Sequence, residues 1–120
     1  MTATQIDISG FDNEDIDRQF TLKSGSADSS SPYDLTDVEF EAEIRDQKNT
    51  LVLRLTSVGD DGGIVITDAP NGVFQIHIAQ GAIAYQQNRS MRYDLLMRAN
   101  GELRRLWGGN VRISQGVTVP

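Results

Sequence analysis

Hydrophobic and polar residues alternate with a period of two along most of the chain. The clearest case is the segment 37–45, in which Val38, Phe40, Ala42 and Ile44 are separated by charged residues. On a helix, at about 100° per residue, these four side chains would point to opposite sides and leave no apolar face. On a strand they share one face. The pattern therefore predicts a half-buried strand, although glutamate by itself favours helix.

A hairpin is predicted directly after this strand. The segment 51–55 places Leu51 and the next two alternate leucines on one face, and the polar stretch 46–49 lies between the two strands. A turn centred on residues 48–49 pairs residues whose numbers sum to 97. The predicted pairs are Ile44 with Leu53 and Ala42 with Leu55 on the core side, and Glu43 with Arg54 on the outer side.

The same alternation recurs at 6–8, 16–22, 74–78, 91–98 and 103–113, and a further short strand is expected at 64–67. Small polar residues at 24–32 and the segment 80–90 are interpreted as loops. In the last strand a bulge is expected at Gly108 and Gly109, with Leu103 and Trp107 both on the core side. The pattern predicts one all-β domain over residues 1–120, a β-sandwich of seven to eight mostly antiparallel strands.

The 120-residue chain has no cysteine, which excludes disulfides and cysteine-based metal sites. No apolar run is long enough to cross a bilayer, and the N-terminus lacks the basic start and apolar core of a signal peptide. We therefore expect synthesis in the cytoplasm and no membrane partner.

Charge is divided unevenly along the chain, whose net charge is -6. Residues 1–61 carry 14 acidic and 5 basic side chains, whereas residues 62–120 carry 3 acidic and 6 basic ones. The arginines of the second half are scattered and the acidic half would repel phosphates, so a nucleic-acid partner is not expected. Either basic strands lie beside acidic ones within the domain, or the basic end of one subunit meets the acidic end of the next.

No catalytic, cofactor or metal site is predicted. Glu39, Glu41 and Glu43 have a tolerable spacing for a carboxylate pair, but nothing near them in sequence supplies the apolar wall that raises a catalytic pKa. The acidic segments "DNEDID" (12–17) and "GDDGG" (59–63) do not match the spacing of an EF-hand. The single histidine, His77, falls on the polar side of its strand and has no second histidine or cysteine to work with.

Four segments carry a family resemblance: "FTLKSG" (20–25), "PYDLTDVEFEAEIRD" (32–46), "RYDLLMRANGELRRLWGGNVRIS" (92–114) and "GVT" (116–118). Together they resemble the immunoglobulin-like β-sandwich modules found in tail and baseplate gene clusters of bacteriophages and prophages, such as the N-terminal domain of baseplate upper proteins. Those modules share a "YDLT" entry into a strand ending in "IR", a "YDL" strand, a glycine turn and a "VT" exit. The segment "QGAIAYQQNRSMR" (80–92) departs from their threonine-rich spacing.

The resemblance implies an immunoglobulin-like fold and a non-enzymatic structural or adaptor subunit of a phage or prophage tail or baseplate. Its expected partners are other virion or tail proteins, or further copies of the chain. Its expected location is the virion after assembly in the cytoplasm of the bacterial host. The acidic strand is expected to meet an arginine-rich protein surface. The candidate interaction face comprises Glu39, Glu41, Glu43, Arg92, Arg98, Arg104 and Arg105.

The alternative function is a carbohydrate-binding module for glycans of the host surface. Sugar sites use exposed aromatic platforms, for which the chain offers Tyr33, Tyr85 and Trp107. Trp107 shares its strand parity with core residues, which argues against its use as a platform.

Overall fold

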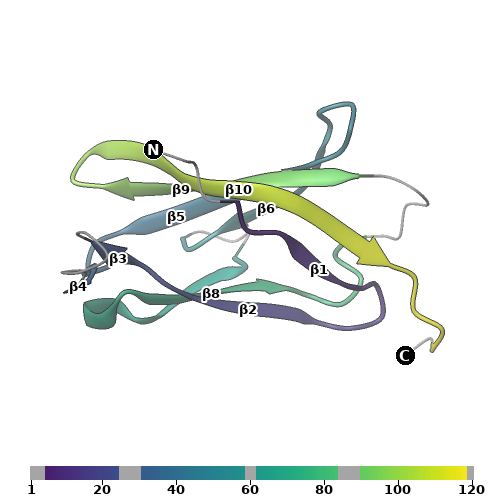
Figure 1. Ribbon diagram of the computed structural model, residues 1–120, viewed down its shortest axis with the longest axis horizontal. Helices are drawn as coiled ribbons and strands as arrows, with labels where there is room; N and C mark the ends of the chain where they lie inside the picture. Colours follow the sequence, from purple (N-terminus) through teal and green to yellow (C-terminus); the bar gives the residue numbers. More distant parts are fainter. Residues whose placement is uncertain (1–4, 25–30, 59–61, 84–89, 119–120) are drawn as a thin grey trace.

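The computed structural model describes residues 5–24, 31–58, 62–83 and 90–118 (Figure 1). This part of the chain contains strands and one short 3-10 turn. The elements are β1 (Ile8–Phe11), β2 (Ile16–Thr21), β3 (Lys23–Ser24), β4 (Ser31–Pro32), β5 (Glu39–Arg45), β6 (Leu51–Thr56), β7 (Ile64–Asp68), η1 (Ala69–Asn71), β8 (Val73–Ile78), β9 (Met91–Ala99) and β10 (Glu102–Ser114).

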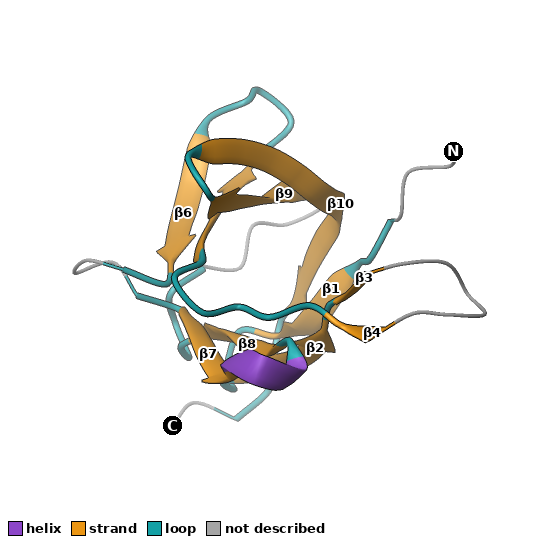
Figure 2. Cartoon of the chain, turned by 90° about the vertical axis from the view of Figure 1, so that its left-hand side faces the viewer, coloured by secondary structure: helices purple, strands orange, loops and turns teal. Residues whose placement is uncertain are grey.

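Two sheets face each other across the core (Figure 2). One sheet has five strands in the order β1-β10-β9-β5-β6, and the other has three in the order β2-β8-β7. The two-residue strands β3 and β4 pair separately. Neighbouring strands are antiparallel except β1, which runs parallel to β10. The predicted all-β fold is confirmed.

Strand β5 has the predicted alternation, with Phe40, Ala42 and Ile44 buried. The predicted hairpin register is confirmed from Glu41 to Ile44, where β5 and β6 residues pair with numbers summing to 97. The register then shifts between Ile44 and Arg45. The turn that follows is organised by Asp46, whose carboxylate accepts hydrogen bonds from two turn amides, each at 2.9 Å.

The register shift corrects one prediction about the second strand of the hairpin. Leu51 was expected on the core side with the other leucines, but it pairs with Arg45 and is 45% exposed. The irregularity at Arg45 carries the first residue of β6 to the outer side, because a one-residue shift reverses which face a side chain occupies. Leu55 remains buried as predicted.

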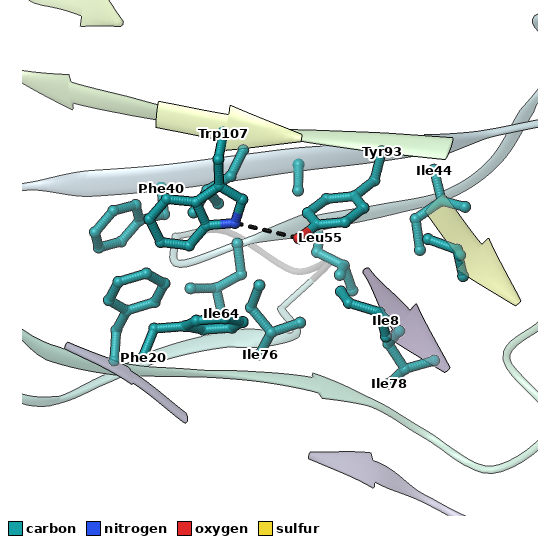
Figure 3. Close-up of a cluster of buried hydrophobic side chains, with 14 of the residues drawn as sticks. Ile8, Phe20, Phe40, Ile44, Leu55, Ile64, Ile76, Ile78, Tyr93 and Trp107 are labelled. Atoms are coloured by element: carbon teal, nitrogen blue, oxygen red, sulfur yellow. Dashed lines mark hydrogen bonds between the residues drawn. The ribbon is translucent and has the colours of Figure 1, made fainter. Parts of the chain in front are cut away.

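The rings of Phe20, Phe40, Phe74 and Trp107 pack against one another in the core, where Figure 3 labels three of them. Phe40 of the larger sheet lies against Phe74 of the smaller one, with ring centroids 4.3 Å apart. Phe20 and Trp107 complete the cluster, with their own centroids 5.3 Å apart. Such large apolar groups contribute most of the burial energy of a small core, at about 25 cal/mol per Å² of apolar area.

Tyr93 joins this core to the N-terminal segment. Its hydroxyl donates to the backbone oxygen of Ile6 at 2.6 Å and accepts a hydrogen bond from the indole nitrogen of Trp107 at 3.2 Å (Figure 3). The approach of this segment to β10 also requires a glycine. A Cβ atom at Gly109 would collide with the backbone oxygen of Ile6. The hydrogen bonds of the Tyr93 hydroxyl thus link Trp107 of β10 and Tyr93 of β9 to the N-terminal segment.

The predicted bulge in β10 lies elsewhere. The register against β9 shifts between Arg105 and Trp107, not at the two glycines. The extra residue is Leu106, and it reverses the parity of the strand. Leu103 was therefore wrongly placed in the core. It pairs with Arg98 and is 48% exposed, whereas Trp107 is buried as predicted.

The loop predicted at 24–32 is wrong at its two ends, where Ser24 lies in β3 and Ser31 and Pro32 form β4, which pairs with β3. Residues 25–30 of that loop lie outside the described part. Residues 69–71 form η1, which is closed by Gly72 in the left-handed conformation with φ of 74°. Residues 80–83 of the predicted loop form neither a helix nor a strand, and residues 84–89 lie outside the described part.

We expect Tyr93→Phe to lower the free energy of unfolding by about 1–3 kcal/mol at neutral pH, because the Ile6 carbonyl and the Trp107 indole lose a hydrogen-bond partner. Burial raises the pKa of Tyr93 above its ordinary value of 10.0, although the Trp107 hydrogen bond opposes this. The stability due to the neutral phenol is fully present below pH 10.0 and is lost as the pH rises through the raised pKa. Urea unfolding from pH 7 to 11.5 measures both effects.

The matched control is Tyr33→Phe, because the Tyr33 hydroxyl forms no hydrogen bond with any described residue. It should leave stability within about 0.5 kcal/mol of the parent. Equal losses in the two variants, or an unchanged alkaline decline in Tyr93→Phe, would contradict the role assigned to Tyr93.

Candidate functional site

The outward side of the five-stranded sheet carries most of the residues proposed from the sequence. We call it the charged face and define it by Glu39, Glu41, Glu43, Arg45, Arg54, Arg92, Asp94, Arg98 and Arg105. Most of these side chains face outward because their neighbours along each strand are buried in the core, and Arg105 faces outward because it pairs with Leu96 of β9. The acidic strand β5 pairs with β9, and Glu39 lies directly opposite Arg98. Basic and acidic strands are thus neighbours in one domain.

The glutamates of β5 are largely matched by arginines of the same face. Arg54 forms an ion pair with Glu41 at 2.8 Å and a longer one with Glu43 at 3.9 Å. Arg45 bonds the other oxygen of Glu43 at 2.8 Å. Pairs this exposed contribute less than about 1 kcal/mol each. They leave the face nearly balanced in charge.

One proposed residue, Arg104, does not join the charged face. It lies opposite the buried Met97 of β9, on the other side of β10 from Arg105, and bonds Glu102 at 2.7 Å. The predicted interaction face included both arginines, but adjacent residues of a strand point to opposite sides. The remaining six residues of the predicted interaction face lie together on the outward side of the sheet.

A hollow crosses the charged face at the hairpin end of β5. It has a volume of about 370 Å³, and Glu43, Arg45, Asn49, Arg92, Tyr93, Asp94 and Arg105 line it. A second hollow of about 280 Å³ shares three of these residues and continues along Gln5, Gly108, Gly109 and Asn110. We call the two together the arginine trough. Gly108 leaves room on this face for the Arg105 guanidinium, with which a Cβ atom at that position would collide.

Two arginines of the trough are held in place. The Arg45 guanidinium bonds the backbone oxygen of Asn49 at 2.9 Å as well as Glu43. The Arg105 guanidinium lies over Gly108, where a Cβ atom would collide with it, and 3.6 Å from a carboxylate oxygen of Asp94.

Arg92 is placed differently from these two. Its guanidinium forms no ion pair or hydrogen bond with any residue that the structure describes, and its direct neighbour on β5 is Arg45. Like charges directly opposite each other on antiparallel strands are destabilising. The trough thus holds two like-charged pairs that lie directly opposite across β5 and β9, Arg45 with Arg92 and Glu43 with Asp94.

The sequence does not reveal the contribution of Arg45, Asn49 or the glycine pair. Arg45 could have been placed on the outer side from the predicted hairpin, but its neighbour Arg92 depends on the β5–β9 register, which joins segments far apart in the chain. The sequence signal for the trough was the pair of glycines inside a strand, because such glycines can mark the close approach of another group as well as a bulge.

The aromatic side chains considered for sugar binding have different surroundings. Trp107 is 7% exposed and cannot serve as a platform. Tyr33 is half-buried and lines a hollow of about 450 Å³, together with Leu22, Lys23, Met97, Ala99, Asn100, Glu102, Arg104 and Leu106. We call this the Tyr33 hollow. Tyr85 lies outside the described residues.

On the outer side of the smaller sheet, Asp17 lies 2.5 Å from the Nδ1 atom of His77 and accepts a hydrogen bond from Gln75. The bond to His77 is the main cause that lowers the pKa of Asp17. Other carboxylates of "DNEDID" brace loops: Asp12 accepts from the Gly116 amide and Asp15 from the Gln80 amide. Within the described residues, no three histidines or carboxylates are grouped to hold a metal.

No protein-family model matches the chain, and no curated protein matches its sequence. Within the residues that the structure describes, no helix is long and apolar enough to span a membrane. Function must therefore be argued from the surfaces themselves.

We expect Arg92→Gln to raise the free energy of unfolding by about 0.2–1 kcal/mol, because it removes the repulsion with Arg45. The gain should be larger at low ionic strength, where charges are less screened. Arg98→Gln is the matched control: it removes an arginine from the same strand and face, but one opposite Glu39, and should not stabilise the protein. Urea unfolding at low and high salt measures the difference. A destabilised Arg92→Gln variant would show that Arg92 is not in an unfavourable position.

Proposed function

We propose that the chain is a non-enzymatic structural or adaptor module of a phage or prophage tail or baseplate, and that it acts by docking on other proteins. The observation that carries this proposal is the charged face, an array of acidic and basic side chains on the outward side of the larger sheet. Its expected partners are other tail or virion proteins, with further copies of the chain as an alternative. Its expected location is the assembled virion.

The order of the strands supports an immunoglobulin-like fold. Variable-type immunoglobulin sandwiches have strands B, E and D in one sheet and G, F, C and C′ in the other. The order β2-β8-β7 corresponds to B-E-D, and β10-β9-β5-β6 corresponds to G-F-C-C′. This correspondence agrees with the resemblance to tail and baseplate modules in the segments 32–46 and 92–114.

The composition of the charged face supports docking on protein. Its cations are all arginine, and arginine is enriched at protein interfaces whereas lysine is depleted. Exposed Leu51 and Leu103 add apolar area on the same side of the sheet. The carboxylates interleaved with the arginines make the face unsuitable for a phosphate backbone.

A second candidate function, glycan binding, is supported by the Tyr33 hollow. It combines one aromatic side chain with the polar groups of Lys23, Asn100, Glu102 and Arg104, a mixture that suits sugar rings and their hydroxyls. If this is the function, Tyr33→Ala should abolish binding to a glycan of the host surface, while charge reversal on the larger sheet should leave it unchanged. A glycan array with both variants separates the two functions.

The docking function is tested by incorporation into particles. Particles from the phage or lysogen that encodes the chain are purified on a density gradient, and the chain is located by immunogold labelling. We expect labelling of the tail, and its loss when Arg92→Glu and Arg98→Glu are combined, because the reversed charges face the partner's own charges.

The matched control for incorporation is Gln19→Glu, an exposed substitution on the smaller sheet. It should be incorporated like the parent. Circular dichroism confirms that each variant is folded. A chain that never sediments with particles would contradict the proposed function, and equal incorporation of all variants would exclude the charged face as the docking surface.

A further inference from the structure

We propose that the arginine trough binds an extended acidic segment of a partner protein and seats one of its carboxylates against Arg92. The inference rests on the proposed docking function and names the chemistry of the partner at one part of the charged face. Three features of the trough support it: its charge, the fixed positions of the neighbouring arginines, and the groups at its two ends.

The charge of the trough matches one carboxylate. Its first hollow contains three guanidinium groups and two carboxylates, so that one positive charge is uncompensated. Arg45 and Arg105 are each matched by a carboxylate, whereas Arg92 has no partner among the described residues. A carboxylate brings the single negative charge needed and fits the planar fork of a guanidinium. A phosphate dianion would bring excess charge next to Glu43 and Asp94.

The surroundings of Arg92 are already arranged before a partner arrives. Arg45 is fixed by Glu43 and the Asn49 carbonyl, and Arg105 lies over Gly108. Arg45, Arg92 and Arg105 lie on paired strands, and Asn49 lies on the tight turn that joins β5 and β6. A partner carboxylate would therefore cancel the repulsion between Arg92 and Arg45 with little ordering of the site.

The ends of the trough suit a peptide better than a small acid. Asn49 lies at one end, and Asn110 and Gln5 lie at the other. Amide side chains both donate and accept hydrogen bonds, as backbone peptide groups require. The second hollow is lined by Gly108 and Gly109, which carry no side chains of their own, and the Arg105 guanidinium lies over Gly108. A charged middle with amide groups at each end fits an extended segment with an acidic residue near its centre.

The acidic segment is expected to come from another protein rather than a second copy. Most carboxylates of the described residues are already engaged, including those of Asp7, Asp12, Asp15 and Asp34. Removing one of them from its intramolecular bonds would offset the gain at the trough.

The test uses the full chain and two short synthetic peptides with blocked ends, one alternating threonine with glutamate and the other threonine with glutamine. Binding is measured by calorimetry at low and high salt, and the site is mapped by amide chemical-shift changes. We expect the glutamate peptide alone to bind, more weakly at high salt, with shifts at Arg92, Gly108 and Gly109. Arg92→Gln should weaken binding about tenfold or more.

The control variant is Arg112→Gln, which removes one exposed positive charge from β10 outside the trough and should bind like the parent. The proposal is overturned if both peptides bind equally, if Arg92→Gln binds like the parent, or if the shifts lie elsewhere. Stronger binding of inorganic phosphate than of the glutamate peptide would indicate a general anion site and would also overturn it. Self-association of the chain that prevents the peptide from binding would overturn the proposal as well. Incorporation into particles would still test the docking function independently.

Discussion

The inward side chains of β5, β9 and β10 pack on Phe74 of the smaller sheet, and this packing determines which charges reach the surface. Phe40 and Trp107 contribute the rings from the larger sheet. Since side chains alternate along a strand, burying these residues forces every second residue of the same strands outward. The glutamates of β5 and the arginines of β9 therefore lie on one face as a consequence of the core.

Sequence reasoning succeeded where structure depends on nearby residues. The alternation of β5, the register of its hairpin with β6 and the burial of Trp107 all follow from local patterns. It failed at Leu103 and Leu51, because a single inserted residue or a one-residue shift reverses the faces beyond it. It could not place Arg45 opposite Arg92, because that pair depends on the register between distant strands.

Most charged side chains of the charged face lie beside an opposite charge, whereas Arg92 does not form an ion pair with any described residue. Glu41 and Glu43 are neutralised by Arg54 and Arg45, which keeps the face from repelling partners of either sign. Arg92 stands against Arg45 at a cost to stability. Residues that reduce stability without a local benefit are characteristic of functional sites, since a protein optimised only for folding would replace them. This is why the proposed binding chemistry centres on Arg92.

The most direct test of this account is a double-mutant cycle on Arg45 and Arg92, measured by urea unfolding with and without a saturating glutamate peptide. In the free protein the account predicts an unfavourable coupling free energy between the two arginines, on the order of a few tenths of a kcal/mol. With peptide bound, the coupling should vanish or become favourable, because the carboxylate lies between the two charges. A coupling that is zero or favourable in the free protein, or that the peptide leaves unchanged, would contradict the account.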